Sequence, residues 1–428
     1  MSHLPATFFL EMAVILVTCR IIGLIGKRFG QPQVVCEMIA GVVLGPSLLG
    51  YFYPDAMNVL FPPAARPVLQ VVSQLGVGLY MFLVGMEFKT DLFRSRARSA
   101  ACVSIAGMAV PFVLGAAVAP WLLGLGTMFA PKATYAQAAM FMGAAIAITA
   151  FPMLARIIYE RGLSGTSLGT LALAAGAIDD ACAWCVLAIV LASFGAAGMT
   201  IFGVDLNPAV IAIGGGVLFA LFLLTIGKWA LRKLGDVAER KGTVDMTMLS
   251  VVLALFSLSA WFTDLIGIHA VFGGFLLGVA MPRGVLTQQI TRKLEPFTVV
   301  FLLPIFFTNS GLSTQLSLLL EPKILLAAIV ILLVSTLGKG VACWAAARLN
   351  GEDNRTSLAV GALMNSRGLM ELIIINIGLQ EGVIQPALFS ILVVMAIVTT
   401  LAASPVFQWV YGRHEKSDGA PVPEGLPG

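Results

Sequence analysis

The chain has 428 residues, of which 59% are hydrophobic and 11% are charged, and its mean hydropathy is +0.95. So much apolar side chain cannot be hidden inside soluble domains, which excludes a soluble enzyme and indicates a polytopic membrane protein. The formal net charge of +4 does not point to nucleic acid, because the Lys and Arg residues lie in short segments between apolar runs rather than along one stripe.

Apolar runs of membrane-crossing length follow one another along almost the whole chain, separated by clusters of Gly, Pro and charged residues. They predict an all-α fold with thirteen transmembrane helices. The predicted spans are 5–26, 33–50, 67–86, 99–123, 134–160, 166–195, 208–231, 246–263, 266–281, 296–313, 322–348, 356–378 and 386–411. The second and the ninth are short, near the lower limit of about 17 residues for a span.

The basic residues fall almost entirely on one predicted side of the membrane. Loops after odd-numbered spans and the C-terminal tail carry 20 Lys and Arg residues, whereas the other side carries only Arg66, Lys132 and Lys323. Positive charge marks the cytoplasmic side. The N-terminus is therefore expected outside the cell and the C-terminus in the cytoplasm.

The fifth predicted span contains a helix breaker near its middle. In the stretch AAIAITAFPMLARII, Pro152 follows Phe151, lacks a backbone donor and crowds the carbonyl of Ile148. Thr149 supplies a hydroxyl beside this break. Proline kinks alone are common in membrane helices, so the break gains weight only together with a second one.

The sixth predicted span carries two adjacent carboxylates, Asp179 and Asp180, in an otherwise apolar stretch. Burying one ionised group there costs several kcal/mol, and two side by side also repel each other. Intramembrane acids are by default residues of an ion pathway or proton relay, with a structural ion pair as the alternative. The pair predicts transport of a cation against protons, because crowded carboxyls hold a proton near neutral pH and an arriving cation expels it.

The longest predicted basic loop, 228–245, follows the seventh span and leaves six spans on each side of that unit. This arrangement fits two repeats of six spans joined by a linker helix, and the repeats are inverted because an offset of seven spans is odd. Under this offset the fifth span corresponds to the twelfth.

The eleventh predicted span supplies a buried base. Lys339 lies between two glycines, about 17 residues from the outer end of its span, which is too deep for its ammonium group to reach water easily. It is the predicted partner of the two aspartates.

The twelfth predicted span is polar at the depth where a bilayer favours leucine. Its polar or helix-breaking residues are Asn365, Ser366, Arg367, Gly368 and Glu371. Unwound backbone at that depth is tolerated only where protein or a water-filled cavity satisfies it, so this break and the one in the fifth span are expected to cross and to line a site. Arg367 and Glu371 lie four residues apart; an internal ion pair is the favoured interpretation, and direct participation in proton movement is the alternative.

Four stretches in this order, AITAFPMLARI, GAIDDACAWCVLA, the Lys339 span and MNSRGLMELIIINIGL, resemble the monovalent cation:proton antiporter-2 family, within it the bacterial relatives of plant cation/proton exchangers and potassium-efflux transporters. The resemblance covers nearly the whole chain. It implies the sodium/proton antiporter fold, in which a core moves like an elevator against a dimerisation domain. It also implies a homodimer in a bacterial inner membrane, with Na⁺ favoured over K⁺ as the cation, and no cofactor.

The domain boundaries that the resemblance implies follow the predicted spans. They are 1–98 and 246–321 for the dimerisation domain, 99–195 and 322–411 for the core, 196–245 for the linker helix and its cytoplasmic loop, and 412–428 for a polar tail. The partners expected are protons, Na⁺ or K⁺ and the lipid bilayer, with no nucleic acid.

The resemblance also assigns roles to the charged residues. It implies that Asp180 carries the ion and the proton, and that Asp179 pairs with Lys339 in the proton-loaded state; Thr149 is expected to add an oxygen ligand for the cation. Many family members have Asn where this chain has Asp179. An Asp–Asp pair with Lys is associated with electrogenic exchange, so more than one proton per cation is expected.

Two other classes of membrane protein remain open on the sequence alone. One is a sodium-coupled symporter of organic anions with a related fold, and the other is a channel or receptor without coupled transport. The symporter would not need adjacent aspartates with an intramembrane lysine, and the channel would not need mobile broken helices.

Overall fold

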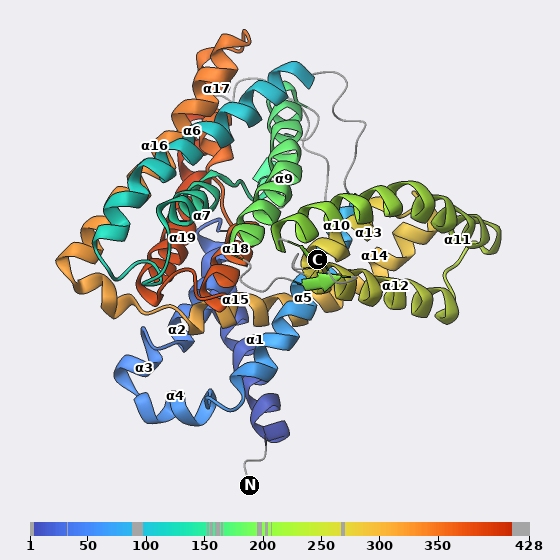
Figure 1. Cartoon of the computed structure of the whole chain (residues 1–428), viewed down its shortest axis with the longest axis horizontal. Coiled ribbons are helices and arrows are strands. Elements are labelled where there is room, and N and C mark those ends of the chain that lie inside the picture. The colour runs from blue at the N-terminus through green and yellow to red at the C-terminus, as the bar shows by residue number, and fades with distance from the viewer. Residues whose placement is uncertain are drawn as a thin grey trace.

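A computed structural model describes residues 4–31, 33–87, 97–151, 154, 157–158, 163, 166–194, 199–201, 204–206, 208–266 and 270–412 of the chain. Helices make up nearly all of this part (Figure 1). The exception is a short antiparallel hairpin of β1 (Met199–Ile201) and β2 (Val204–Leu206), which the all-α prediction did not include.

One group of helices, called the scaffold group below, comes from two separated parts of the chain. Its members are α1 (Leu4–Arg28), α2 (Gln33–Leu44), α3 (Leu49–Phe52), α4 (Pro54–Leu60), α5 (Arg66–Glu87), α12 (Met246–Leu265), α13 (Ala270–Ala280), α14 (Val285–Phe297), the π-helical turn η3 (Thr298–Leu302) and α15 (Leu303–Leu312). Within it, α2 packs on α15 and α5 packs on α13. A Cβ atom added to Gly41 of α2 would lie 2.7 Å from the Cα atom of Thr308 in α15, so the backbones meet where no side chain intervenes.

A second group, called the crossing group below, contains the helices that carry the acidic and broken segments. Its members are α6 (Ala97–Gly124), α7 (Tyr135–Ala147), α9 (Ser167–Phe194), α16 (Pro322–Leu349), α17 (Asn354–Met364), α18 (Leu369–Gln380) and α19 (Pro386–Tyr411). Helices α6 and α16 pack on each other, and the others surround them. The 3₁₀ turn η4 (Leu316–Leu320) leads from the scaffold group into α16.

The helix contacts come in matching sets. The pair α2 and α15 matches α5 and α13, and the pair α1 and α2 matches α12 and α13. In the crossing group, α6 with α7 matches α16 with α17, and α6 with α9 matches α16 with α19. Each pair becomes its counterpart when the elements are shifted by seven predicted spans, which is the pattern that two repeats of six spans would give.

Two segments predicted to be loops are helical, and these predictions were wrong. Helix α10 (Pro208–Phe222), the π-helical turn η2 (Leu223–Gly227) and α11 (Lys228–Lys241) follow without interruption, so the expected loop 228–245 is mostly helix. The interval between the ninth and tenth spans contains α14. Both α11 and α14 have one apolar face, α11 burying Leu231 and Ala238 and α14 burying Leu286 and Ile290, and the two helices pack together beside α12 at one side of the bundle (Figure 1).

Each of the thirteen predicted ranges contains helix among its described residues. The second range is interrupted at 45–48, between α2 and α3, and the fifth and twelfth are broken as described below. Among the described residues, eight helices are long and apolar enough to cross a membrane, and four shorter apolar helices accompany them. The chain is therefore a helical integral membrane protein. That thirteen segments cross the bilayer stays a prediction.

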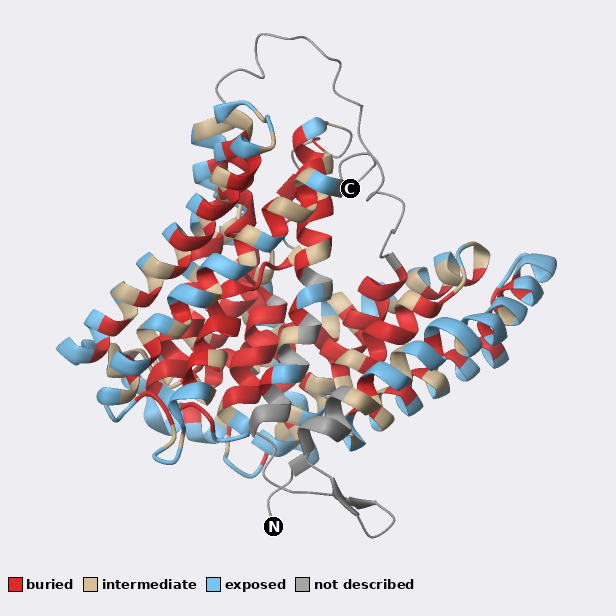
Figure 2. Ribbon diagram, turned by 45° about the horizontal axis from the view of Figure 1, so that its top comes forward, coloured by how far each residue is buried: buried red, intermediate tan, exposed pale blue. Residues whose placement is uncertain are grey.

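Burial is greatest in the middle of the helical bundle (Figure 2). One cluster of buried apolar residues draws on both groups, with Met38 and Phe306 from the scaffold group and Phe141 and Ile373 from the crossing group. Charged residues are buried in the same region, among them Asp179, Lys339 and Arg367.

Candidate functional site

The fifth predicted span is broken at residues 148–150. Helix α7 begins with a capping box between Thr134 and Gln137 and ends at Ala147, and Ile148 has extended backbone with ψ of 137°. Phe151 and Leu154 are helical again, whereas Pro152 lies outside the described residues. The carbonyl groups of the last turn of α7 therefore have no partner within their own helix.

The twelfth predicted span is broken at residues 365–368. Helix α17 ends at Met364 and α18 begins at Leu369, and Gly368 between them has extended backbone with φ of 173°. The backbone N–H of Ala150 donates a hydrogen bond to the carbonyl of Ser366 at 3.0 Å. This bond joins the two breaks, so the broken spans meet at their interruptions, as the sequence predicts.

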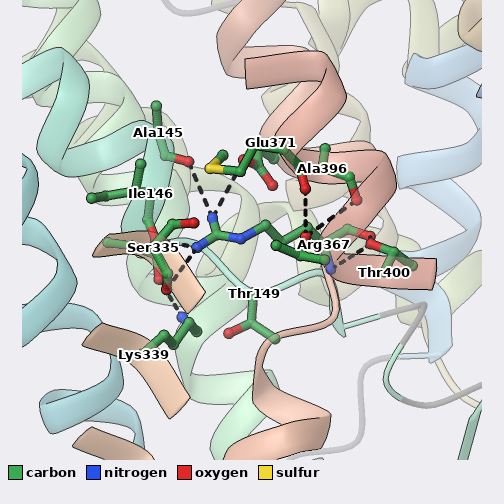
Figure 3. A network of polar contacts seen from close by, with 12 residues as sticks. Ala145, Ile146, Thr149, Ser335, Lys339, Arg367, Glu371, Ala396 and Thr400 are labelled. Carbon is green, nitrogen blue, oxygen red and sulfur yellow. Dashed lines mark hydrogen bonds and ion pairs between the residues drawn. The ribbon is translucent and has the colours of Figure 1, made fainter. Parts of the chain in front are cut away.

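Arg367 connects the second break to the end of α7 (Figure 3). Its side chain is fully buried, and its guanidinium donates to the carbonyls of Ile146 at 2.7 Å and Ala145 at 3.4 Å. The same group forms an ion pair with Glu371 at 3.3 Å and reaches the carbonyl of Ser335 at 3.4 Å. A cation at the C-terminal end of a helix is favoured by the helix dipole as well as by these hydrogen bonds.

Lys339 is the second cation at the end of α7. Its ammonium group is fully buried and donates a hydrogen bond to the carbonyl of Ala147. It also forms an ion pair with Asp179 at 3.2 Å. Lys339 therefore links the orphan carbonyl of one broken helix to the acid on α9.

Asp179 is surrounded by donors from two other helices, α6 and α16, and from the break after α7. One carboxylate oxygen accepts a hydrogen bond from Ser104 at 2.5 Å, and the other accepts from Thr149 at 2.6 Å and from Lys339. The hydroxyl of Thr149 also lies 3.3 Å from the carbonyl of Met364, at the end of α17. The oxygens of Asp179, Thr149 and Met364 thus gather at the point where the breaks meet.

Several buried polar atoms at the crossing have no hydrogen-bond partner among the described residues. They are Asn365 Oδ1, Ser366 Oγ, Arg367 Nε and one carboxylate oxygen of Glu371. Buried polar atoms are normally satisfied, and four exceptions at one place indicate a functional region rather than a packing core. Three of these four atoms are oxygens, the ligand type that alkali cations prefer.

A family model described as "Sodium/hydrogen exchanger, transmembrane" matches residues 13–411. The chain belongs to the sodium/hydrogen exchanger family. The family expected from the motifs, that of the monovalent cation:proton antiporters, is therefore confirmed.

Relatives of this exchanger match it over almost its whole length. The Na⁺/H⁺ antiporter NhaS4 of Synechocystis is 39% identical, with 94% of this chain and 96% of the relative covered. The Na⁺/H⁺-K⁺ antiporter GerN of Bacillus cereus is 26% identical and is covered to 98%, against 96% of this chain. Cation/H⁺ antiporter 20 of Arabidopsis thaliana is 34% identical over 95% of this chain, but the exchanger spans only 49% of that relative, about half its length.

A solved structure supports the fold. The sodium proton antiporter MjNhaP1 from Methanocaldococcus jannaschii superposes with a TM-score of 0.65 at 14% identity, covering 94% of the exchanger and 95% of that chain. At this identity the likeness shows the fold alone.

The crossing brings together most of the residues that the sequence singles out. Asp179 contacts Lys339 and Thr149, and Arg367 contacts Glu371. The side chain of Asp180 lies outside the described residues, although its backbone continues α9 beside Asp179. Their roles in transport stay predictions.

Two hydroxyl groups of this site were not predicted from the sequence. Ser104 donates to Asp179, and Thr400 bonds the backbone of Arg367, accepting from its N–H at 3.0 Å and donating to its carbonyl at 2.6 Å. Single hydroxyl residues are common in membrane helices, so nothing in the sequence distinguishes these two.

Proposed function

We propose that the chain is a secondary active antiporter, not an enzyme, that exchanges a monovalent cation for protons, with Na⁺ favoured and K⁺ as the second candidate. Membership of the sodium/hydrogen exchanger family supports the exchange. The order of the two ions follows the names of relatives, which include a Na⁺/H⁺ antiporter, a Na⁺/H⁺-K⁺ antiporter and the K⁺/H⁺ antiporter 1 of Saccharomyces cerevisiae.

The charge balance of the crossing carries this proposal. Lys339 and Arg367 supply two positive charges, and Asp179 and Glu371 supply two negative charges, so these four buried groups sum to zero. In the sequence Asp180 directly follows Asp179, and the proposal takes its carboxylate to belong to the same site. In a medium of low dielectric an unpaired charge is costly, so this extra carboxylate needs either one proton or one monovalent cation. The two ions therefore compete for one place.

The exchange then follows from competition for Asp180 and its neighbour. With protons loaded, Asp180 is neutral and Lys339 holds Asp179. A dehydrated cation that enters between the carboxylates, with Thr149 as a further oxygen ligand, expels the proton of Asp180 and weakens the ion pair of Lys339, which then releases a second proton. Release of the Asp180 proton alone keeps the charges balanced and exchanges one proton per cation. The second proton, from Lys339, makes the exchange electrogenic and leaves the cation-loaded crossing with one net negative charge.

Movement of the crossing group against the scaffold group would carry the site across the membrane. The segments 99–195 and 322–411 would form the moving core and 1–98 and 246–321 the dimerising scaffold, with 196–245 as linker. The matched helix contacts within each group support this division and the inverted repeat. The same proposal includes thirteen spans, an outside N-terminus, a cytoplasmic tail 412–428, a homodimer and a bacterial inner membrane.

The two alternative classes are not favoured. A sodium-coupled organic-anion symporter or an uncoupled channel has no evident use for a buried lysine that shares an ion pair with one of two adjacent aspartates. Membership of an exchanger family also weighs against both.

Proton flux in liposomes tests the proposal. The full chain is reconstituted with a pH-sensitive dye inside, and Na⁺ or K⁺ is added outside. We expect a cation-dependent pH change that responds to an imposed membrane potential and disappears in Asp180→Asn, because Asn keeps the shape but has no removable proton. Asp264→Asn, an exposed acid at the end of α12, is the matched control and should exchange normally. Robust exchange by Asp180→Asn would overturn the assignment.

A further inference from the structure

A second polar region lies between the two groups of helices, away from the charged crossing. A cavity of about 20 Å³, room for about one water molecule, is enclosed by α5 and α15 of the scaffold group and α18 of the crossing group. Its polar lining consists of Gln70, Ser73, Gln74, Asn309, Asn376 and Gln380. Uncharged polar side chains between membrane helices either form hydrogen bonds across the helices or line a path for water or ions.

On all three helices the residues that line the cavity change from polar to apolar in the direction of the crossing. On α18, Gln380 is exposed, Asn376 is buried and Ile373, one turn nearer the break, is apolar. On α15, Asn309 is followed in this direction by Phe306, and on α5 Gln74 is followed by Val77. The three apolar residues are at most 5% exposed and belong to one hydrophobic cluster. The cavity thus has a polar mouth and an apolar floor that separates it from the crossing.

A hydrogen bond between the groups holds this floor together. The side-chain amide of Asn376 donates to the hydroxyl of Ser310 at 2.8 Å and to the carbonyl of Leu372 in its own helix at 2.8 Å. Helix α18 packs on α7 and α19, whereas α15, which carries Ser310, packs on α2 and α5. The bond to Ser310 therefore fixes a moving element against a stationary one, if the groups move as proposed above.

We infer that this cavity is the closed outer vestibule of the cation path, and that the Asn376–Ser310 hydrogen bond is the latch that keeps it closed. The inference rests on the proposed function. Amide and hydroxyl oxygens suit a hydrated monovalent cation and, being neutral, do not hold it tightly. Movement of α18 away from α15 breaks the latch, parts Ile373 from Phe306 and Val77, and opens the mouth to the crossing. Asn376 is in this account a positioning residue.

Cysteine labelling tests the latch without requiring transport. Ile373→Cys in the full chain is exposed to a membrane-impermeant maleimide from one side of the vesicles or the other, and the chain with only its six native cysteines gives the background. We expect slow labelling, from the outer side only. Adding Asn376→Leu or Ser310→Ala should raise the labelling rate about two- to tenfold, the shift in population that follows from loss of one neutral hydrogen bond. The two changes together should raise it no further.

The control is Thr399→Val, because the hydroxyl of Thr399 is also buried but, within the part of the chain that the structure describes, bonds carbonyls of its own helix. It should leave labelling unchanged. The inference would be overturned if neither Asn376→Leu nor Ser310→Ala changed the labelling rate of Ile373→Cys. Labelling from the cytoplasmic side would overturn it as well. The same series in Asp180→Asn separates the two proposals, because the latch should respond there even when exchange is lost.

Discussion

The two broken helices end in different ways although they meet at one place. The last carbonyls of α7 accept hydrogen bonds from the charged groups of Arg367 and Lys339. These carbonyls are those of Ala145, Ile146 and Ala147. The end of α17 is satisfied by neutral donors instead. The side-chain amide of Asn365 donates to the carbonyl of Gly361 at 3.3 Å, and the hydroxyl of Thr149 lies near the carbonyl of Met364.

This difference indicates where a cation can bind. At the end of α7 the fixed positive charges of Arg367 and Lys339 repel a second cation. A carbonyl near a hydroxyl group can instead share its oxygen with an ion, because the hydroxyl turns at little cost. Thr149 lies at this neutral end and also contacts Asp179. The α7 end is therefore expected to provide stability, and the α17 end to provide cation affinity.

The largest effect on stability is expected from the charged end. Arg367→Met leaves two carbonyls of α7 and the carboxylate of Glu371 without their cation, and losing one partner of a buried ion pair costs about 3 to 5 kcal/mol. Thermal unfolding in detergent measures the loss. Adding Glu371→Gln should restore part of it, because no unpaired charge then remains.

The same pair of variants distinguishes the two roles considered for Arg367 and Glu371. If the ion pair is structural, the double variant regains stability and keeps the pH profile of exchange. A double variant that is stable but has a displaced pH profile would instead assign the pair to proton movement.

The neutral end should affect affinity more than stability. Thr149→Val keeps the shape of the side chain but removes the hydroxyl from Asp179 and from the proposed cation ligands. The hydroxyl is one neutral oxygen ligand of the proposed cation, and about 1.4 kcal/mol of binding free energy is a factor of ten, so the cation KM should rise about tenfold. Concentration dependence of proton flux measures it, and Thr149→Ser should restore the wild-type value. An unchanged KM in Thr149→Val would place the cation elsewhere.

The smallest effect concerns the far end of α17, where Asp353 lies outside the predicted span 356–378. Asp353 caps this helix by accepting from the backbone N–H groups of Arg355 at 2.9 Å and Thr356 at 3.1 Å. A side-chain hydrogen bond with Thr356, followed by these backbone bonds, lowers the pKa of Asp353 below its usual 3.8. Because the folded pKa is the lower one, the stabilisation is present above pH 4 and is lost as the pH falls through the folded value.

Asp353→Ala should therefore weaken the first turn of α17 at pH 7 by on the order of 1 kcal/mol. Hydrogen exchange of that turn measures the change, and the difference from wild type should shrink toward pH 3. A difference that grows on acidification would contradict the assigned role of the carboxylate.

The sequence was informative where a residue conflicted with its surroundings. Charged residues are costly in an apolar span, so the pairing of Lys339 with Asp179 and that of Arg367 with Glu371 could be predicted from the sequence. The contact of Ser104 with Asp179 and that of Ser310 with Asn376 could not be predicted. Such residues are tolerated in many helices, and their partners depend on how the helices cross. Helix α11 was predicted as a loop because its many charged residues lower the average hydropathy of the segment. That average does not show the one apolar face with which the helix packs.

The thermal stability and pH profile of Lys339 and Asp179 variants, measured as a double-mutant cycle, test the central claim most directly. Lys339→Ala leaves Asp179 without its cation and should lower stability by about 3 to 5 kcal/mol. It should also shift the activity profile toward alkaline pH, because the aspartate pair then keeps its protons longer. Adding Asp179→Asn should recover part of the stability. Additive destabilisation with an unmoved pH optimum would show that Lys339 and Asp179 do not act as partners in the exchange.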